Sequence, residues 1–131
     1  MKGVYILNIF LKKDIRLRVG SLGVMEFKKG YYIYTGSAMG GLEQRIRRHL
    51  RKTKKLHWHV DYLLQKAEIK DVRIKESFSK QEECRTANLL SAAGGAIVPG
   101  FGCSDCKCKT HLYYFKNPFT TRIANYKTMA I

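Results

Sequence analysis

The sequence has no apolar run that approaches the ~20 residues a membrane-spanning helix needs. Residues 1–8 lack the charged head, the long apolar stretch and the small-residue cleavage site of a signal peptide. The sequence also contains no internal repeat, no linker and no low-complexity block. These absences predict a single domain over residues 1–131 that is cytoplasmic and has no membrane partner.

Acidic residues are scarce. The chain has 25 Lys and Arg against 10 Asp and Glu, which gives a formal net charge of +15 at pH 7. Such an excess of one sign causes self-repulsion in the compact state, so it favours a polyanionic partner. Nucleic acid is the first choice, because phosphate neutralisation and counterion release supply most sequence-independent affinity. An anionic membrane surface is less favoured, since no basic amphipathic helix carries bulky aromatic side chains on its apolar face.

The sequence does have the material for a hydrophobic core. Of its 131 residues, 45% are hydrophobic, and they include 8 Tyr, 6 Phe and 1 Trp. A chain of this length buries roughly two thirds of the surface that its unfolded form exposes. This composition excludes a disordered chain and a miniprotein that depends on disulfides.

The spacing of the apolar residues predicts an α/β (α+β) fold. Short apolar or alternating runs predict strands at 2–10, 15–19, 24–27, 31–35, 69–76 and 111–115. Apolar residues at helical spacing predict helices at 42–50, 56–67 and 79–92. Ser79 and Glu82 match a capping box at the start of the last helix, and we expect loops at 36–41 and 99–109. The expected architecture is a small, mainly antiparallel sheet flanked by helices, in which strands 15–19 and 24–27 form a hairpin.

Positive charge is densest between residues 45 and 55, where no acid interrupts it. At about 100° per residue, Arg45 and Arg47 flank the apolar stripe of the helix, and Arg48 points away from it. A charge run is often only a solvated helix face, but the excess over the whole chain favours phosphate contact. With the basic face of strand 15–19 and the start of the next helix, the residues expected to bind nucleic acid are Arg16, Arg18, Arg47, Arg48, Arg51, Lys52, Lys54, Lys55, Trp58 and His59.

The helix expected at 56–67 begins with aromatic and polar residues. Its periodicity places His57 and Asp61 one turn apart on one flank, which favours a structural hydrogen-bonded pair. Trp58 points away from the apolar stripe on the same spacing, so it is either free to stack on a nucleobase or a packing anchor. His59 lies on the other flank.

Polar side chains also lie close to the apolar faces of two helices. His49 lies on the same flank as Arg45 and one turn later, so the two can act together. Glu83 projects to the same side as the apolar residues of helix 79–92, and a carboxylate in that position needs a partner. Two solutions are open for Glu83, namely an ion pair with Arg45 or Lys80, or a bound divalent metal.

Two tripeptides, Gly3-Val4-Tyr5 and Tyr34-Thr35-Gly36, resemble the two-part signature of the GIY-YIG nuclease superfamily. The resemblance continues into helix 42–50, which carries Arg45 and His49, and into a later helix with a single acid at Glu83. Further short runs over nearly the whole chain are similar to a small prokaryotic branch of that superfamily. The connection between the two tripeptides is longer than in the family, which implies an inserted hairpin.

This resemblance implies a divalent-metal-dependent endonuclease that hydrolyses phosphodiester bonds in DNA rather than RNA. Its setting would be repair or recombination, with a fused domain or a partner protein for targeting. Glu83 would hold Mg²⁺ or Mn²⁺, and Arg45 would neutralise charge that develops on the phosphate. Tyr5 would act as the general base or help to orient it, with Tyr34 as its partner across the sheet and His49 sharing in proton transfer. A basic nucleic-acid-binding module without catalysis is the alternative from another functional class.

The cysteines form a second pattern. Three of them precede His111 as C-x-x-C-x-C-x-x-H, and the fourth, Cys84, follows Glu83. Four thiolate or imidazole ligands complete a tetrahedral Zn²⁺ site, and the most plausible set is Cys84, Cys106, Cys108 and His111. Two other interpretations are open, namely a disulfide, which a reducing cytosol disfavours, and small buried residues. A zinc ion there would brace the helix that carries Glu83.

Overall fold

Strand β1 (Gly3–Leu11) is the centre of the fold, and its side chains are nearly all buried. The structure, a computed structural model, describes residues 2–77, 79, 81–101, 110–118 and 126–129. β1 pairs antiparallel with β4 (Gly30–Ala38) on one side and with β5 (Glu68–Glu76) on the other. Strands buried on both sides in this way are nearly continuous apolar runs in the sequence, and residues 3–11 are interrupted only by Asn8.

Short strands complete two sheets. The main sheet has the order β6-β7-β4-β1-β5-β8, with β6 (Ala96–Ile97), β7 (Leu112–Phe115) and β8 (Lys127–Met129) added by antiparallel pairing. The second sheet is the hairpin of β2 (Ile15–Arg18) and β3 (Val24–Phe27), joined by the 3-10 turn η1 (Gly20–Leu22). This hairpin lies between β1 and β4 in the chain, as predicted for strands 15–19 and 24–27.

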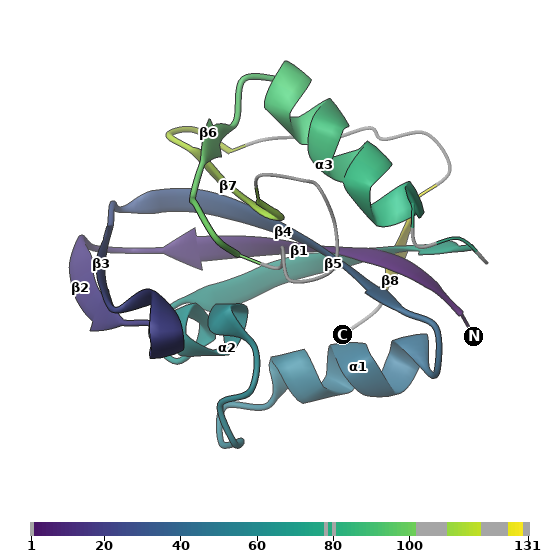
Figure 1. Ribbon diagram of the computed structural model, residues 1–131, viewed down its shortest axis with the longest axis horizontal. Helices are drawn as coiled ribbons and strands as arrows, with labels where there is room; N and C mark the ends of the chain where they lie inside the picture. Colours follow the sequence, from purple (N-terminus) through teal and green to yellow (C-terminus); the bar gives the residue numbers. More distant parts are fainter. Residues whose placement is uncertain (1, 78, 80, 102–109, 119–125, 130–131) are drawn as a thin grey trace.

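Helices cover both faces of the main sheet (Figure 1). α1 (Leu42–Leu50) and α2 (His59–Leu64) lie on one face, and α3 (Gln81–Ala92) lies on the other. Successive strand residues point to opposite faces, so Tyr5 belongs to the core layer under α1 and α2, and Ile6 to the layer under α3. The fold class predicted from the sequence, an antiparallel sheet flanked by helices, is confirmed. In the described part of the chain, no helix has the length and apolarity to cross a membrane.

Some predicted boundaries were wrong. Residues 36–38, expected in a loop, continue β4, because they pair with residues 3–5 of β1. α2 begins at His59 rather than at residue 56 and ends at Leu64 rather than at residue 67. Its start follows from Asp61, whose carboxylate accepts the N–H groups of the two residues before the helix. Strands β6 and β8 were not predicted, since two or three residues show no periodicity.

The capping box at α3 forms differently from the prediction. The hydroxyl of Ser79 accepts the N–H of Gln81 at 3.2 Å, as a cap does. The carboxylate of Glu82 lies 2.7 Å from the ammonium of Lys75 on β5. Glu82 therefore ties α3 to the sheet, a role that the predicted capping box did not include.

Candidate active site

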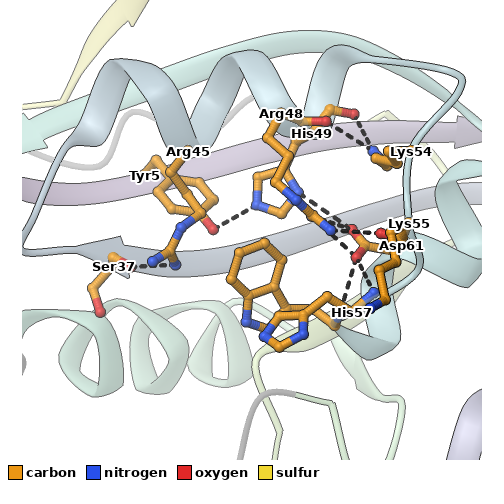
Figure 2. Close-up of polar contacts among 10 residues, drawn as sticks. Tyr5, Ser37, Arg45, Arg48, His49, Lys54, Lys55, His57 and Asp61 are labelled. Atoms are coloured by element: carbon orange, nitrogen blue, oxygen red, sulfur yellow. Dashed lines mark hydrogen bonds and ion pairs between the residues drawn. The ribbon is translucent and has the colours of Figure 1, made fainter.

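Tyr5 and His49 are joined by a hydrogen bond beneath α1. The Tyr5 Oη lies 2.7 Å from the His49 Nε2, and both side chains are only 2% exposed. β1 directs Tyr5 to this face, and α1 directs His49 inward beside its apolar stripe (Figure 2). Tyr34 of β4 lies near both, with ring centroids 6.5 Å from Tyr5 and 6.2 Å from His49. The structure therefore brings together three residues that the resemblance implies for catalysis.

Burial sets the protonation of this group. Loss of hydration lowers the pKa of His49 to about 3, against the weaker opposing effect of Asp61, so the imidazole is neutral at pH 7. Loss of hydration raises the pKa of Tyr5 well above its usual value, and the Arg45 guanidinium opposes that rise. Burial likewise raises the pKa of Tyr34. In the resting protein, the hydrogen bond therefore joins a neutral phenol to a neutral imidazole.

Ser37 links α1 to α3 across the end of β4. The Arg45 Nη1 donates to the main-chain carbonyl of Ser37 at 3.1 Å, and Figure 2 shows the guanidinium directed at it. On the other face of the strand, the Ser37 hydroxyl donates to the Glu83 Oε2 at 2.6 Å. Arg45 and Glu83 come from helices on opposite faces of the sheet, and this single residue bonds to both.

Glu83 has two close polar neighbours among the described residues. Besides Ser37, the His111 Nδ1 lies 2.7 Å from the Glu83 Oε1, and the imidazole is 1% exposed on its side chain. Of the two ion-pair partners left open for Glu83, Arg45 is not used, because its guanidinium donates to the Ser37 carbonyl and packs on Trp58 on the far side of the strand. The other partner considered for Glu83, Lys80, lies outside the described residues.

The donor set at Glu83 fits a magnesium ion that keeps most of its water. Mg²⁺ is commonly held by one or two carboxylates and several waters. Each carboxylate oxygen of Glu83 has one protein partner and so keeps a lone pair, and the side chain is 17% exposed. Within the residues that the structure describes, no group of three or more His, Cys, Asp or Glu side chains is arranged to hold a metal. A divalent ion at Glu83 would therefore depend on water and substrate for its other ligands.

Two of the four predicted zinc ligands are adjacent. The Cys84 Sγ lies 3.9 Å from the His111 Nε2, while the other ring nitrogen of His111 faces Glu83. A histidine that binds zinc usually donates its other ring N–H to a carboxylate, which orients the ring. Cys106 and Cys108 lie outside the described residues, so the prediction of a zinc site is untested.

The basic residues predicted to bind nucleic acid differ in exposure and in their contacts within the protein. Four of them have polar contacts within the protein: Arg16 lies 3.7 Å from Glu26, Arg48 pairs with Asp61 and with the carbonyl of Lys55, Lys52 donates to the carbonyl of Ala67, and Lys54 donates to the last carbonyls of α1. Burial lowers the pKa of Lys54. The exposed members of the set are Arg16, Arg18, Arg47, Arg51, Lys52 and Lys55.

Trp58 does not point away from the core as its helical position predicted. The ring is half-buried against the core layer under α1 and α2, and the guanidinium carbons of Arg45 and Arg48 each lie 4.4 Å from its centroid. The reason is that Trp58 precedes α2 with extended backbone, so a helical wheel does not describe it. Its contact with two guanidiniums makes it a platform for Arg45. The His59 ring, half-buried, packs on Phe101 at 5.9 Å between centroids.

Asp61 and Ser37 were not recognised as site residues. His57 and Asp61 were predicted to form a pair, but the contact uses the main-chain N–H of His57, at 2.8 Å, rather than its ring. Asp61 is fully buried and lies beside His49 and Arg48. Asp61 is the first acid after the basic run of residues 45–55, which is a usable sequence signal. Ser37 gave none, because its role depends on the pairing of β4 with β1.

A scan against protein families finds a model that matches residues 4–130, nearly the whole chain. The chain belongs to the family described as Domain of unknown function DUF123. Comparisons with curated proteins and with solved structures find no match. The DUF123 match therefore covers the whole Tyr5–Glu83 site, and the chemistry has to be inferred from the arrangement of its residues.

Gly36 is required by the packing of Tyr5. The two residues are cross-strand partners, and a Cβ atom at Gly36 would overlap the Tyr5 ring and hydroxyl. We expect Gly36→Ala to lower the free energy of unfolding by about 1–3 kcal/mol, as overpacking of a core does. Gly40→Ala is the matched control, because nothing lies within 4 Å of a Cβ there. Urea denaturation of both variants measures the difference, and equal stability would show that Tyr5 is not held in this position.

Proposed function

We propose that this DUF123 protein is a divalent-metal-dependent endonuclease of GIY-YIG type that acts on DNA. The observation that carries the proposal is the arrangement of Tyr5 bonded to His49, with Arg45 next to them and joined through Ser37 to Glu83. It combines a proton relay, a cation and a carboxylate with spare lone pairs. Those are the three elements that phosphodiester hydrolysis requires.

Tyr5 and His49 supply the proton relay. As a water oxygen bonds to phosphorus, its proton passes to the Tyr5 Oη, the phenolic proton passes to the His49 Nε2, and the bond from phosphorus to the leaving oxygen breaks. The 2.7 Å hydrogen bond is within the range at which a general base acts. Tyr5 is nearly fully buried, so the water has to reach it beside the half-buried Arg45.

Arg45 and Glu83 supply the charge. The Arg45 guanidinium lowers the pKa of Tyr5, which favours loss of the phenolic proton, and it can neutralise charge on the phosphoryl oxygens. Trp58 and the Ser37 carbonyl hold it in place. When bound at Glu83, a Mg²⁺ or Mn²⁺ ion supplies positive charge that stabilises the leaving oxygen.

The charge of the surface supports nucleic acid as the substrate class. With a net charge of +15, the chain has a cationic excess, and the exposed arginines Arg47 and Arg51 flank the end of α1 that carries His49. Neutralising the phosphates of DNA with such residues gives salt-sensitive binding. We propose DNA over RNA on the resemblance to the superfamily, and the test has to include both.

The decisive experiment is a cleavage assay on labelled single strands, duplexes, flaps and junctions of DNA and RNA, with Mg²⁺, with Mn²⁺ and with a chelator. We expect cleavage of at least one DNA substrate with either ion and none with the chelator. Binding at low salt without product under any ion would overturn the enzyme proposal and support a nucleic-acid-binding module. Product from RNA alone would overturn the choice of DNA.

A further inference from the structure

Asp61 is the most completely buried acid of the described chain, and it lies behind the proton relay. Its side chain is 0% exposed. The Oδ2 accepts the main-chain N–H groups of His57 and Trp58 at 2.8 and 2.9 Å, and Arg48 Nη1 lies 3.1 and 3.2 Å from the two oxygens. Burial alone would raise the pKa of Asp61, but these hydrogen bonds and the Arg48 charge outweigh burial and lower it. Asp61 is therefore an anion at pH 7.

Helix capping accounts for only one oxygen of this carboxylate. The Oδ2 has three donors, whereas the Oδ1 has Arg48 and faces the His49 Nδ1 at a separation of 3.9 Å. The His49 Nδ1 is buried and has no hydrogen-bonding partner among the residues that the structure describes. A nitrogen without a partner and a carboxylate oxygen thus face each other across a short gap, on the opposite side of the imidazole from Tyr5.

A neutral imidazole carries its proton on one nitrogen only. With the proton on Nδ1, the N–H dipole is directed at the Asp61 anion, and the Nε2 lone pair is free to accept the Tyr5 O–H. With the proton on Nε2, a lone pair would face the carboxylate, and Nε2 would donate to Tyr5 instead of accepting. Electrostatics therefore favour the first form.

We propose that Asp61 is a positioning residue that holds His49 in the Nδ1-protonated form, so that Nε2 can take the proton of Tyr5. Its catalytic consequence rests on the proposed function, whereas the protonation pattern does not. Asp61 also faces the imidazolium that forms when the Tyr5 proton moves. The other charged groups near His49 are Arg45, Arg48 and Lys54, all cations, so Asp61 is the group that favours the charged form.

The first measurement is ¹⁵N NMR of the histidine rings in the whole wild-type chain at pH 7. The proposal expects the His49 signals of an Nδ1-protonated neutral ring. Asp61→Asn is the test variant, because the amide oxygen can still accept the His57 and Trp58 N–H groups while its NH₂ is turned towards His49. We expect that change to shift His49 to the Nε2-protonated form and to lower the rate of DNA cleavage by about 10²-fold.

Asp71→Asn is the matched control, since Asp71 is bonded to Asn8 of β1 and lies outside the site. It should leave both the His49 form and the cleavage rate unchanged. An Nε2-protonated His49 in the wild-type chain would overturn the proposal even if Asp61→Asn failed to fold, and so would an unchanged His49 in a folded variant. Absence of cleavage by the wild-type chain, with the tautomer shift observed, would refute the nuclease and leave the positioning role intact.

Discussion

Replacing Tyr5 with phenylalanine should lower the DNA cleavage rate by about 10³-fold, within the range that a general base contributes. The variant keeps the ring that packs against Gly36 and removes only the hydroxyl that is bonded to His49. The free energy of unfolding should fall by about 1–3 kcal/mol, because the buried His49 nitrogen loses its partner. Single-turnover cleavage measures the first effect and urea denaturation the second.

Tyr32→Phe is the matched control for this change. Tyr32 is another buried tyrosine of the same core layer, and its hydroxyl donates to the carbonyl of Lys28 at 2.7 Å. The two variants therefore lose one buried hydroxyl each, but only one of them loses the contact with His49. We expect Tyr32→Phe to cleave DNA at the wild-type rate. Equal rates for both variants would exclude Tyr5 from the chemistry.

Local periodicity was sufficient for the parts of the site that lie on one element. Arg45 and His49 are one helical turn apart, which predicts that both lie on the same flank of α1. In the structure both lie beside Tyr5. The inward position of Glu83 also followed from the apolar spacing of α3, and the structure has it 17% exposed on its side chain. In each case a regular helix relates sequence distance to direction in space.

Contacts between distant segments could not be predicted in the same way. One partner of Glu83 is His111, which directly precedes β7 and reaches α3 through the pairing of β7 with β4 in the sheet. Trp58 lies outside α2, so its direction depends on the start of the helix, which Asp61 fixes through main-chain bonds. These features depend on the register of strands and on one helix boundary, and neither leaves a periodic signal in the sequence.

Glu83→Gln should lower the cleavage rate by about 10³-fold with either Mg²⁺ or Mn²⁺. A bound metal ion stabilises the transition state by several kcal/mol, and each 1.4 kcal/mol of activation barrier changes the rate about tenfold. The amide can still accept the hydroxyl of Ser37, so we expect the fold to persist. Glu82→Gln is the matched control, since Glu82 is also 17% exposed on its side chain but is paired with Lys75 on the neighbouring strand. That control should cleave at the wild-type rate.

The same variant separates two roles for Glu83 that its neighbours allow. As a ligand of the catalytic ion, Glu83 affects the rate and its dependence on metal concentration, while the midpoint of thermal unfolding changes little. If Glu83 instead orients His111 in a zinc site with Cys84, the substitution should lower the zinc content and the thermal stability before it lowers the rate. The reason is that structural zinc contributes directly to folding. Rate, metal analysis and thermal unfolding on one preparation distinguish these roles. A variant that cleaves at the wild-type rate would exclude the first role and, with it, the proposed position of the metal.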